Sequence, residues 1–183
     1  MNPNPSTDAA PTSATSAKPV WAVVMGVAGC GKSTIGRRVA QALAIAFIEG
    51  DAFHPPENVQ KMTQGIALDD NDRQGWLNRL GEELQRHPGG AVLSCSALKR
   101  AYRERLRSAI PALRFIHLRV GQDLANARVN ARAGEHLFPP SLVASQFAAL
   151  EDPITEPRVL QLDGAVAPSV VGQQAIDWMR SPL

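Results

Sequence analysis

An eight-residue run from Gly26 to Ser33, Gly-Val-Ala-Gly-Cys-Gly-Lys-Ser, constrains the fold of this chain more than any other feature. It matches the pattern G-x-x-x-x-G-K-S, whose glycines let the backbone curl so that successive N–H groups point at phosphate oxygens. In that pattern the ammonium group of Lys32 reaches the β- and γ-phosphates, and the Ser33 hydroxyl can ligate Mg²⁺. The run therefore predicts a binding site for a nucleoside triphosphate.

The residues around this loop predict a strand before it and a helix after it. Residues 20–25 are an uninterrupted apolar run, as in a buried strand, and Ile35, Val39 and Leu43 form a helical stripe. A strand, this loop and a helix in succession make up the known phosphate-binding motif. The nucleotide-binding residues that we expect are Gly26, Val27, Ala28, Gly29, Cys30, Gly31, Lys32, Ser33 and Thr34.

The size and charge of the chain suit a one-domain cytoplasmic protein. We expect a single domain over residues 20–183 after a disordered, polar tail over residues 1–19. The 19 Lys and Arg residues nearly balance the 17 Asp and Glu residues, so we expect neither a nucleic-acid partner nor a membrane partner. Two cysteines make no disulfide framework and fit a reducing cytoplasm.

Strands and helices alternate along the rest of the chain. Strands are predicted over residues 20–25, 46–49, 91–95, 114–118 and 158–162. After the first helix, further helices are predicted over residues 56–62, from the capping residues 69–72 through Leu84, from the fourth strand to about Ala133, and over residues 142–150. A helix after the third strand is predicted to carry Leu98, Tyr102 and Leu106 on one face, and the last helix is predicted to carry Val171, Ala175 and Trp178. This order predicts an α/β fold with a five-stranded parallel sheet and helices on both faces, which binds its ligands at the carboxyl ends of the strands.

The second strand ends in polar residues that suit an acceptor site. A phosphoryl acceptor needs its hydroxyl in line with the γ-phosphate, and a carboxylate is the usual group that takes the proton. We expect Asp51 to take this role and Glu49 to hold a Mg²⁺-bound water. His54 is a candidate for binding the acceptor, and a structural role before the Pro55-Pro56 turn is the alternative.

The third and fourth strands lack the terminal aspartate with which phosphate-loop motors and switches organise Mg²⁺ and the attacking water. The third strand runs into Ser94-Cys95-Ser96, and the fourth runs into Arg119-Val120. The guanine-reading motif N-K-x-D is also absent from the sequence. The sequence therefore favours phosphoryl transfer to a small molecule with a hydroxyl group over hydrolysis.

Two basic residues are candidates for binding an anionic acceptor. Lys99 lies nearest the end of the third strand, so it is the member of its basic helix that we expect to point inward. Arg73 opens the helix that would cover the acceptor, and its guanidinium could hold a carboxylate with two hydrogen bonds. A surface role for Arg73 fits its position equally well.

Two further arginines predict a small lid over about residues 132–141. Arg128 and Arg132 lie four residues apart on one helix face, before the irregular segment 134–140. A lid arginine can stack on adenine or neutralise charge on the transferring phosphoryl group, and lid closure excludes water. A solvated helix face is the alternative reading of this pair.

Taken together, these stretches resemble the bacterial-type gluconokinase family, small phosphate-loop kinases related in fold to shikimate and adenylate kinases. The narrowest matches are Gly-Asp-x-x-His-Pro-Pro and Cys-Ser-Ala-Leu-Lys-Arg, and all matches follow the family's order and spacing. They cover residues 26–34, 49–58, 61–62, 65–73, 76–77, 94–103, 145–147, 150–151 and 153.

The resemblance implies a P-loop NTPase fold of the nucleoside-monophosphate and shikimate kinase type. It implies the phosphorylation of D-gluconate to 6-phospho-D-gluconate by ATP with Mg²⁺, and a homodimer. It places gluconate near Asp51, His54, Lys61, Arg73 and Lys99, and ATP on the loop and the lid arginines. One departure is visible: the family usually reads Gly-His-Phe-Met/Phe-Pro in the lid, whereas residues 134–139 read Gly-Glu-His-Leu-Phe-Pro, with an extra residue beside His136.

Two other functions stay open at this point. One is a kinase for another small hydroxy acid such as shikimate, which would share the loop and lid and differ in the acceptor pocket. The other is a regulatory protein that binds ATP without catalysis, and the presence of both Lys32 and Asp51 counts against it.

Overall fold

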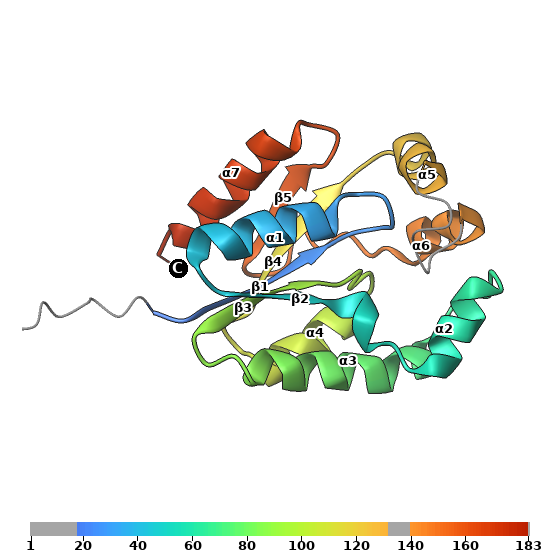
Figure 1. The fold of residues 1–183 in the computed structure, drawn as a ribbon, viewed down its shortest axis with the longest axis horizontal. Coiled ribbons are helices and arrows are strands. Elements are labelled where there is room, and N and C mark those ends of the chain that lie inside the picture. The colour runs from blue at the N-terminus through green and yellow to red at the C-terminus, as the bar shows by residue number, and fades with distance from the viewer. Residues whose placement is uncertain (1–17, 132–139, 183) are drawn as a thin grey trace, which may run out of the picture.

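The computed structural model describes residues 18–131 and 140–182, which form a parallel five-stranded sheet between two layers of helices (Figure 1). The strands are β1 (Val20–Met25), β2 (Ala46–Glu49), β3 (Gly90–Ser94), β4 (Arg114–Arg119) and β5 (Val159–Asp163). They pair in the order β2-β3-β1-β4-β5. The predicted α/β class and the number of strands are confirmed, and each strand begins and ends within one residue of its expected position.

Seven helices and two 3₁₀ turns connect the strands in the described part of the chain. The helices are α1 (Lys32–Leu43), α2 (Pro56–Thr63), α3 (Asp70–Gln85), α4 (Arg100–Ala109), α5 (Gln122–Asn130), α6 (Val143–Ala149) and α7 (Pro168–Arg180), and the turns are η1 (Gly50–Phe53) and η2 (Pro140–Leu142). Figure 1 shows α1 and α7 on one face of the sheet, α3 and α4 on the other, and α2, α5 and α6 beyond the carboxyl ends of the strands.

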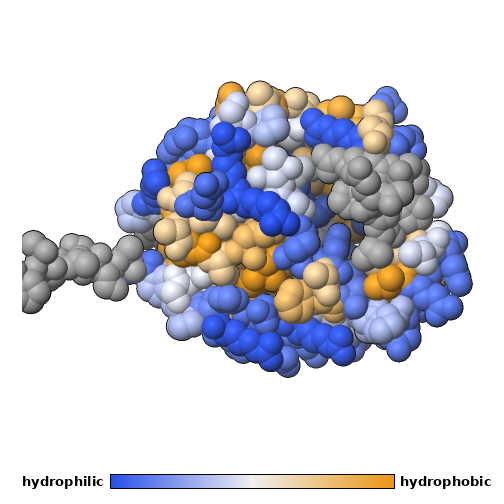
Figure 2. Space-filling view, in the orientation of Figure 1, coloured by the Kyte–Doolittle hydropathy of each residue, from blue (hydrophilic) through white to orange (hydrophobic). Residues whose placement is uncertain are grey.

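Each face of the sheet has its own apolar core. Val24 and Ile116 pack with residues of α1 and α7, whereas Val23 and Phe115 pack with residues of α3 and α4. Side chains alternate between the faces of a strand, so β1 and β4 contribute to both cores and are buried on both sides. Figure 2 shows hydrophilic residues over the outer surface of α3 and apolar residues between the helix layers, where the edge strand β2 lies.

The helix α3 begins as its sequence predicts. The Asp69 side chain accepts a hydrogen bond from the backbone N–H of Asp72, and the Asp72 side chain accepts one from Asp69, which is a complete capping box. The glycine at position 81 is needed within this helix, because a Cβ there would lie 2.9 Å from the Cβ of Ala109 on α4. The close approach of α3 and α4 therefore compensates for the low helix propensity of glycine.

The prediction that Leu98 lies on the helix after β3 is wrong. The helix α4 begins at Arg100, and Leu98 is buried in the loop before it. The backbone at Ala97 has φ 43°, and Lys99 is extended, so the chain cannot be helical there. The expected helix to Ala133 likewise ends at Asn130.

No helix within residues 18–131 and 140–182 has the length and the apolar composition required to cross a membrane.

Candidate active site

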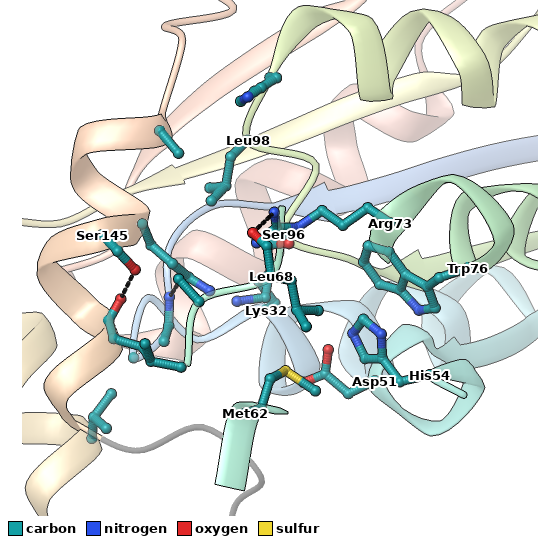
Figure 3. Close-up of a pocket in the computed structure, with 18 of the residues that line it drawn as sticks. Lys32, Asp51, His54, Met62, Leu68, Arg73, Trp76, Ser96, Leu98 and Ser145 are labelled. Atoms are coloured by element: carbon teal, nitrogen blue, oxygen red, sulfur yellow. Dashed lines mark hydrogen bonds between the residues drawn. The ribbon is translucent and has the colours of Figure 1, made fainter. Parts of the chain in front are cut away.

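A cavity of about 310 Å³ lies at the carboxyl edge of the sheet. It is lined by the loop after β1, by η1, by the start of α3, by the loop after β3, and by residues of α5 and α6. Figure 3 shows Asp51, His54 and Trp76 grouped on one side of this cavity and Ser145, on α6, on the other. Of the predicted site residues outside the loop, five line this cavity: Asp51, His54, Arg73, Lys99 and Arg128.

The phosphate-binding loop approaches its neighbours too closely to carry a side chain at its first position. Gly26 has φ 134°, and a Cβ there would lie 2.7 Å from the carbonyl oxygen of Leu118. Its N–H donates to the Ser96 carbonyl at 3.3 Å, which ties the loop to the chain after β3. Cys30 is buried beneath the loop, and burial raises the pKa of its thiol, so it fills space there and is no nucleophile.

The side chains of Lys32 and Ser33, at the end of the loop, have defined contacts. Lys32 Nζ donates to the carbonyl of Val27 at 3.0 Å, so its ammonium group curls back over the loop. The hydroxyls of Ser33 and Ser94 lie 3.4 Å apart, which puts two neutral hydroxyl oxygens at the junction of α1 and β3.

The helix α6 also contacts the loop. The backbone N–H of Ala28 donates to Gln146 Oε1 at 2.6 Å, and the Gln146 side chain is nearly buried. Sequence reasoning found residues 145–147 only as part of a resemblance and gave Gln146 no role. The two residues are 118 positions apart, so only the fold reveals their contact.

Arg128 lies between this cavity and a second one of about 150 Å³ on the other side of the loop. Its guanidinium Nη1 donates to the carbonyls of Gly164 at 2.9 Å and Gly29 at 3.3 Å. The second cavity has apolar walls that include Val166, from the connection between β5 and α7, and Pro168, the first residue of α7. Sequence reasoning missed this connection, although it follows the carboxyl end of a strand, where ligands are expected.

Asp51 is carried by η1, which Trp76 holds in place. Trp76 Nε1 donates to the Gly50 carbonyl at 2.8 Å, and Trp76 is 1% exposed. The His54 ring stacks on the Trp76 ring with 4.2 Å between centroids and 15° between planes. Burial, together with the positive charge of Arg73, lowers the pKa of His54 to about 4, so its imidazole is neutral at neutral pH.

The neutral His54 ring has a defined tautomer. The buried Asn58 donates through Nδ2 to the Asp72 carbonyl at 2.8 Å, and the same Nδ2 lies 3.4 Å from His54 Nδ1. A carbonyl oxygen only accepts, so Nδ2 must be the atom that faces it, and His54 Nδ1 is then an acceptor. The remaining proton of His54 is on Nε2, the atom available to donate to a ligand.

The two predicted cations of the acceptor side differ in their pairing. Lys99 Nζ donates to both carboxylate oxygens of Asp70, at 2.7 and 2.8 Å, and the Tyr102 hydroxyl donates to the same carboxylate. These hydrogen bonds hold the pKa of Asp70 below its usual value. Arg73 instead donates to the backbone carbonyls of Leu68 and Asp69, and no carboxylate of the described residues forms an ion pair with it.

Outside the phosphate-binding loop, two predicted site residues do not line the cavity, and within the loop Gly26, Val27 and Cys30 do not line it either. Lys61 Nζ lies 2.6 Å from Asp72 Oδ1, and Glu49 is 3.8 Å from the guanidinium of Arg37. Arg132, the lid over about residues 132–141 and the departure at His136 fall largely or wholly outside the described residues.

Comparisons with known proteins assign the family. A family model described as an AAA domain matches residues 22–157. The gluconokinase of Gluconobacter oxydans (strain 621H) is 43% identical over 162 residues, which cover 87% of this chain and 90% of that protein. The thermoresistant gluconokinase of Escherichia coli (strain K12) is 41% identical over 145 residues, which cover 77% of this chain and 82% of that protein. This chain belongs to the gluconokinase family.

Solved structures agree with this family assignment. The crystal structure of a gluconokinase from Sinorhizobium meliloti 1021 has a TM-score of 0.81 and 43% identity, and covers 88% of this chain and 92% of that one. An APS kinase structure from Mycobacterium tuberculosis has a TM-score of 0.64 at 20% identity, which speaks for the fold alone. The resemblance to gluconokinases, the P-loop kinase fold and the prediction of a kinase are confirmed.

Proposed function

We propose that this protein transfers the γ-phosphoryl group of ATP to the terminal hydroxyl of D-gluconate, giving ADP and 6-phospho-D-gluconate. The observation that carries the proposal is a single cavity lined by the phosphate-binding loop, by Asp51 and by Arg73, which forms no ion pair with a carboxylate of the described residues. Membership of the gluconokinase family supports gluconate as that acid.

On the donor side, the N–H groups of the loop and Lys32 would hold the β- and γ-phosphates. Arg128 lies beside the loop and would add positive charge against the phosphates, and Arg132 is proposed for the same task from the sequence. The second cavity, with Val166 and Pro168, is a suitable apolar place for the adenine base.

The residues present fit a Mg²⁺ ion bound chiefly by phosphates and water. The Ser33 and Ser94 hydroxyls supply oxygen atoms at the loop, and the described residues contain no cluster of three or more His, Cys, Asp and Glu side chains that would form a complete site. Ser33 would hold the ion directly, and Glu49, through a water, is the more distant candidate. The ion would neutralise charge on the β- and γ-phosphates.

On the acceptor side, Asp51 would orient the gluconate hydroxyl and accept its proton. The hydroxyl oxygen forms the new bond to the γ-phosphorus, the bond from phosphorus to the β–γ bridging oxygen breaks, and ADP leaves with that electron pair. Arg73 would hold the substrate carboxylate, since its guanidinium is free of acidic partners among the described residues. His54 Nε2 would donate to a substrate hydroxyl, and Lys99, which lines the cavity, would lie near the substrate, whereas a role for Lys61 rests on the resemblance alone.

An assay of ADP release across several acceptors tests this proposal. Gluconate should give the fastest turnover, ahead of other sugar acids, shikimate and AMP. Faster turnover with shikimate or another acid would overturn the choice of acceptor. ATP binding without ADP release for any acid would favour a regulatory protein instead.

Two further expectations complete the proposal. A homodimer follows from the resemblance, and light scattering of the purified protein would measure it. Both cysteines are free and buried, which suits the reducing cytoplasm that we propose as the site of this reaction.

A further inference from the structure

The side chain of Gln146 enters the active-site cavity from α6, an element to which the proposed reaction gives no task. Gln146 lines the same cavity as Lys32, Ser33 and Asp51 and is 9% exposed. Its position is fixed from both ends of its helix. Val143 is fully buried before it, and after it the backbone N–H of Glu151 donates to the Leu98 carbonyl at 2.9 Å.

The hydrogen bond to the loop decides which way the Gln146 amide points. The backbone N–H of Ala28 can only donate, so the atom 2.6 Å from it must be the carbonyl oxygen Oε1. The amide nitrogen Nε2 with its two protons is therefore at the other end of the group. Among the described residues, Nε2 donates to no protein acceptor, and it is not one of the buried atoms that lack a partner, so it remains accessible from the cavity that Gln146 lines. The cavity is where a ligand could supply that acceptor.

We propose that Gln146 is a catalytic residue whose Nε2 donates a hydrogen bond to an oxygen of the γ-phosphoryl group during transfer. This inference rests on the proposed function, which puts the γ-phosphate between the loop and Asp51. Ala28 belongs to the loop, so the amide that caps its N–H lies at the border of the phosphate site.

A donor at this position suits the chemistry of phosphoryl transfer. Negative charge spreads over the equatorial oxygens of the transferred group, and catalysis consists mostly of positioning and electrostatic stabilisation. The Ala28 N–H holds the amide in place before ATP binds, so little reorganisation is needed at the moment of transfer. A neutral donor also adds stabilisation without trapping the phosphoryl group as strongly as another fixed cation.

The variants Gln146→Glu and Gln146→Met separate donation from support of the loop. Glutamate keeps an oxygen for the Ala28 N–H and loses the donor, whereas methionine removes both at similar volume. With gluconate and ATP, we expect each variant to lose roughly 10²-fold in kcat, the usual effect of removing one such donor. Gln174→Glu, on the exposed face of α7, makes the same chemical change outside the site and should keep the wild-type rate.

The affinity of the protein for nucleotides in the absence of gluconate tests the role of Gln146 independently of turnover. In titration calorimetry, Gln146→Met should bind a non-hydrolysable ATP analogue about tenfold more weakly, a loss of about 1.4 kcal/mol, and bind ADP as the wild type does. A distorted loop would instead weaken both nucleotides, because the loop also holds the β-phosphate. Thermal melting of each variant checks that it is folded.

Three alternative results would overturn the inference. Full activity of Gln146→Glu would make the residue a support for the loop. Loss in Gln146→Glu alone would indicate repulsion by the new carboxylate, and equal loss of ADP and ATP-analogue affinity in Gln146→Met would indicate loop distortion. A wild-type protein inactive on gluconate would overturn the proposed function instead, and the nucleotide titrations would still test Gln146.

Discussion

Asp51 is the residue on which the proposed reaction depends most directly. Asp51→Asn keeps the shape of the side chain and removes its ability to take a proton, so kcat should fall by roughly 10²-fold or more. The affinity for ATP should stay close to that of the wild type, because the loop is unchanged. Stopped assays of ADP formation measure the first effect, and nucleotide titration measures the second. Asp177→Asn, on the exposed face of α7, is the matched control, and near-normal turnover of Asp51→Asn would remove Asp51 from this role.

Arg73 should determine the affinity for the acid. Arg73→Met removes the cation that has no acidic partner among the described residues, so the KM for gluconate should rise by roughly 10- to 100-fold, as for loss of a charged hydrogen bond. The KM for ATP should change little. Initial rates over a matrix of both substrate concentrations separate these effects. An unchanged KM for gluconate would show that the carboxylate binds elsewhere.

Individual residues were predictable from the sequence where local spacing carries the chemistry. Lys32 and Asp51 follow strand ends, and the structure brings both to one cavity. The contact of Gln146 with the loop and the hydrogen bond from Trp76 to η1 span 118 and 26 positions, so no local pattern encodes them. Spacing also could not tell that Lys61 pairs with Asp72 outside the cavity.

At the scale of elements, a buried ion cluster fastens α4 to the chain before β5. Arg103 is fully buried and donates to both carboxylate oxygens of Glu156, and Arg107 lies 2.7 Å from the same carboxylate. Arg103 also donates to the carbonyls of Ala97 and Leu98, in the loop that carries Lys99 into the cavity. The cluster therefore stabilises the loop that carries Lys99 into the cavity.

Glu156→Gln should destabilise the protein strongly. It leaves two arginines without their counter-charge, one of them fully buried, and breaking a buried pair from one side costs about 3–5 kcal/mol. Urea unfolding followed by circular dichroism measures the change. Glu104→Gln breaks the exposed pair with Arg100 by the same substitution and should cost at most about 1 kcal/mol. Equal costs for the two variants would contradict a structural role for the buried cluster.

The boundaries of elements were predictable where capping and apolar periodicity agree, as in α3 with its capping box at Asp69 and Asp72. They were not predictable where a buried residue sits outside regular structure. Leu98 fits a helical stripe with Tyr102 and Leu106, but the left-handed backbone at Ala97 delays the helix until Arg100. The spacing of apolar residues indicates which residues are buried, and a buried residue can belong to a loop as well as to a helix.

For the whole molecule, the alternation of strands and helices predicts a parallel sheet but not its strand order. The central position of β1 depends on pairing with both β3 and β4, which lie far along the chain. Even so, the rule that ligands bind at the carboxyl ends of strands pointed to the edge at which the cavity lies, without the strand order. That edge collects the loop, η1 and the residues after β3 into one cavity.

The stability of the whole fold should decrease between pH 7.5 and pH 5. Burial lowers the pKa of His117 to about 4, with Arg103 and Arg119 acting in the same direction and Asp152 opposing them. The unfolded chain has a His pKa near 6.5, so it binds more protons than the folded protein in this range, and stability rises with pH. For His117 alone the loss on going to pH 5 is about 2 kcal/mol, and His54 adds to it.

His117→Asn should flatten this dependence, because asparagine offers an acceptor to Gln161 near the place of Nδ1 and does not titrate. Urea unfolding at pH 7.5 and pH 5.0 gives the free energies for wild type and variant. The carboxylates whose pKa is lowered, such as Asp70 and Asp72, titrate below this window and affect both proteins equally. A variant at His117 that keeps the wild-type slope would show that the buried imidazole is not the group that makes this fold sensitive to acid.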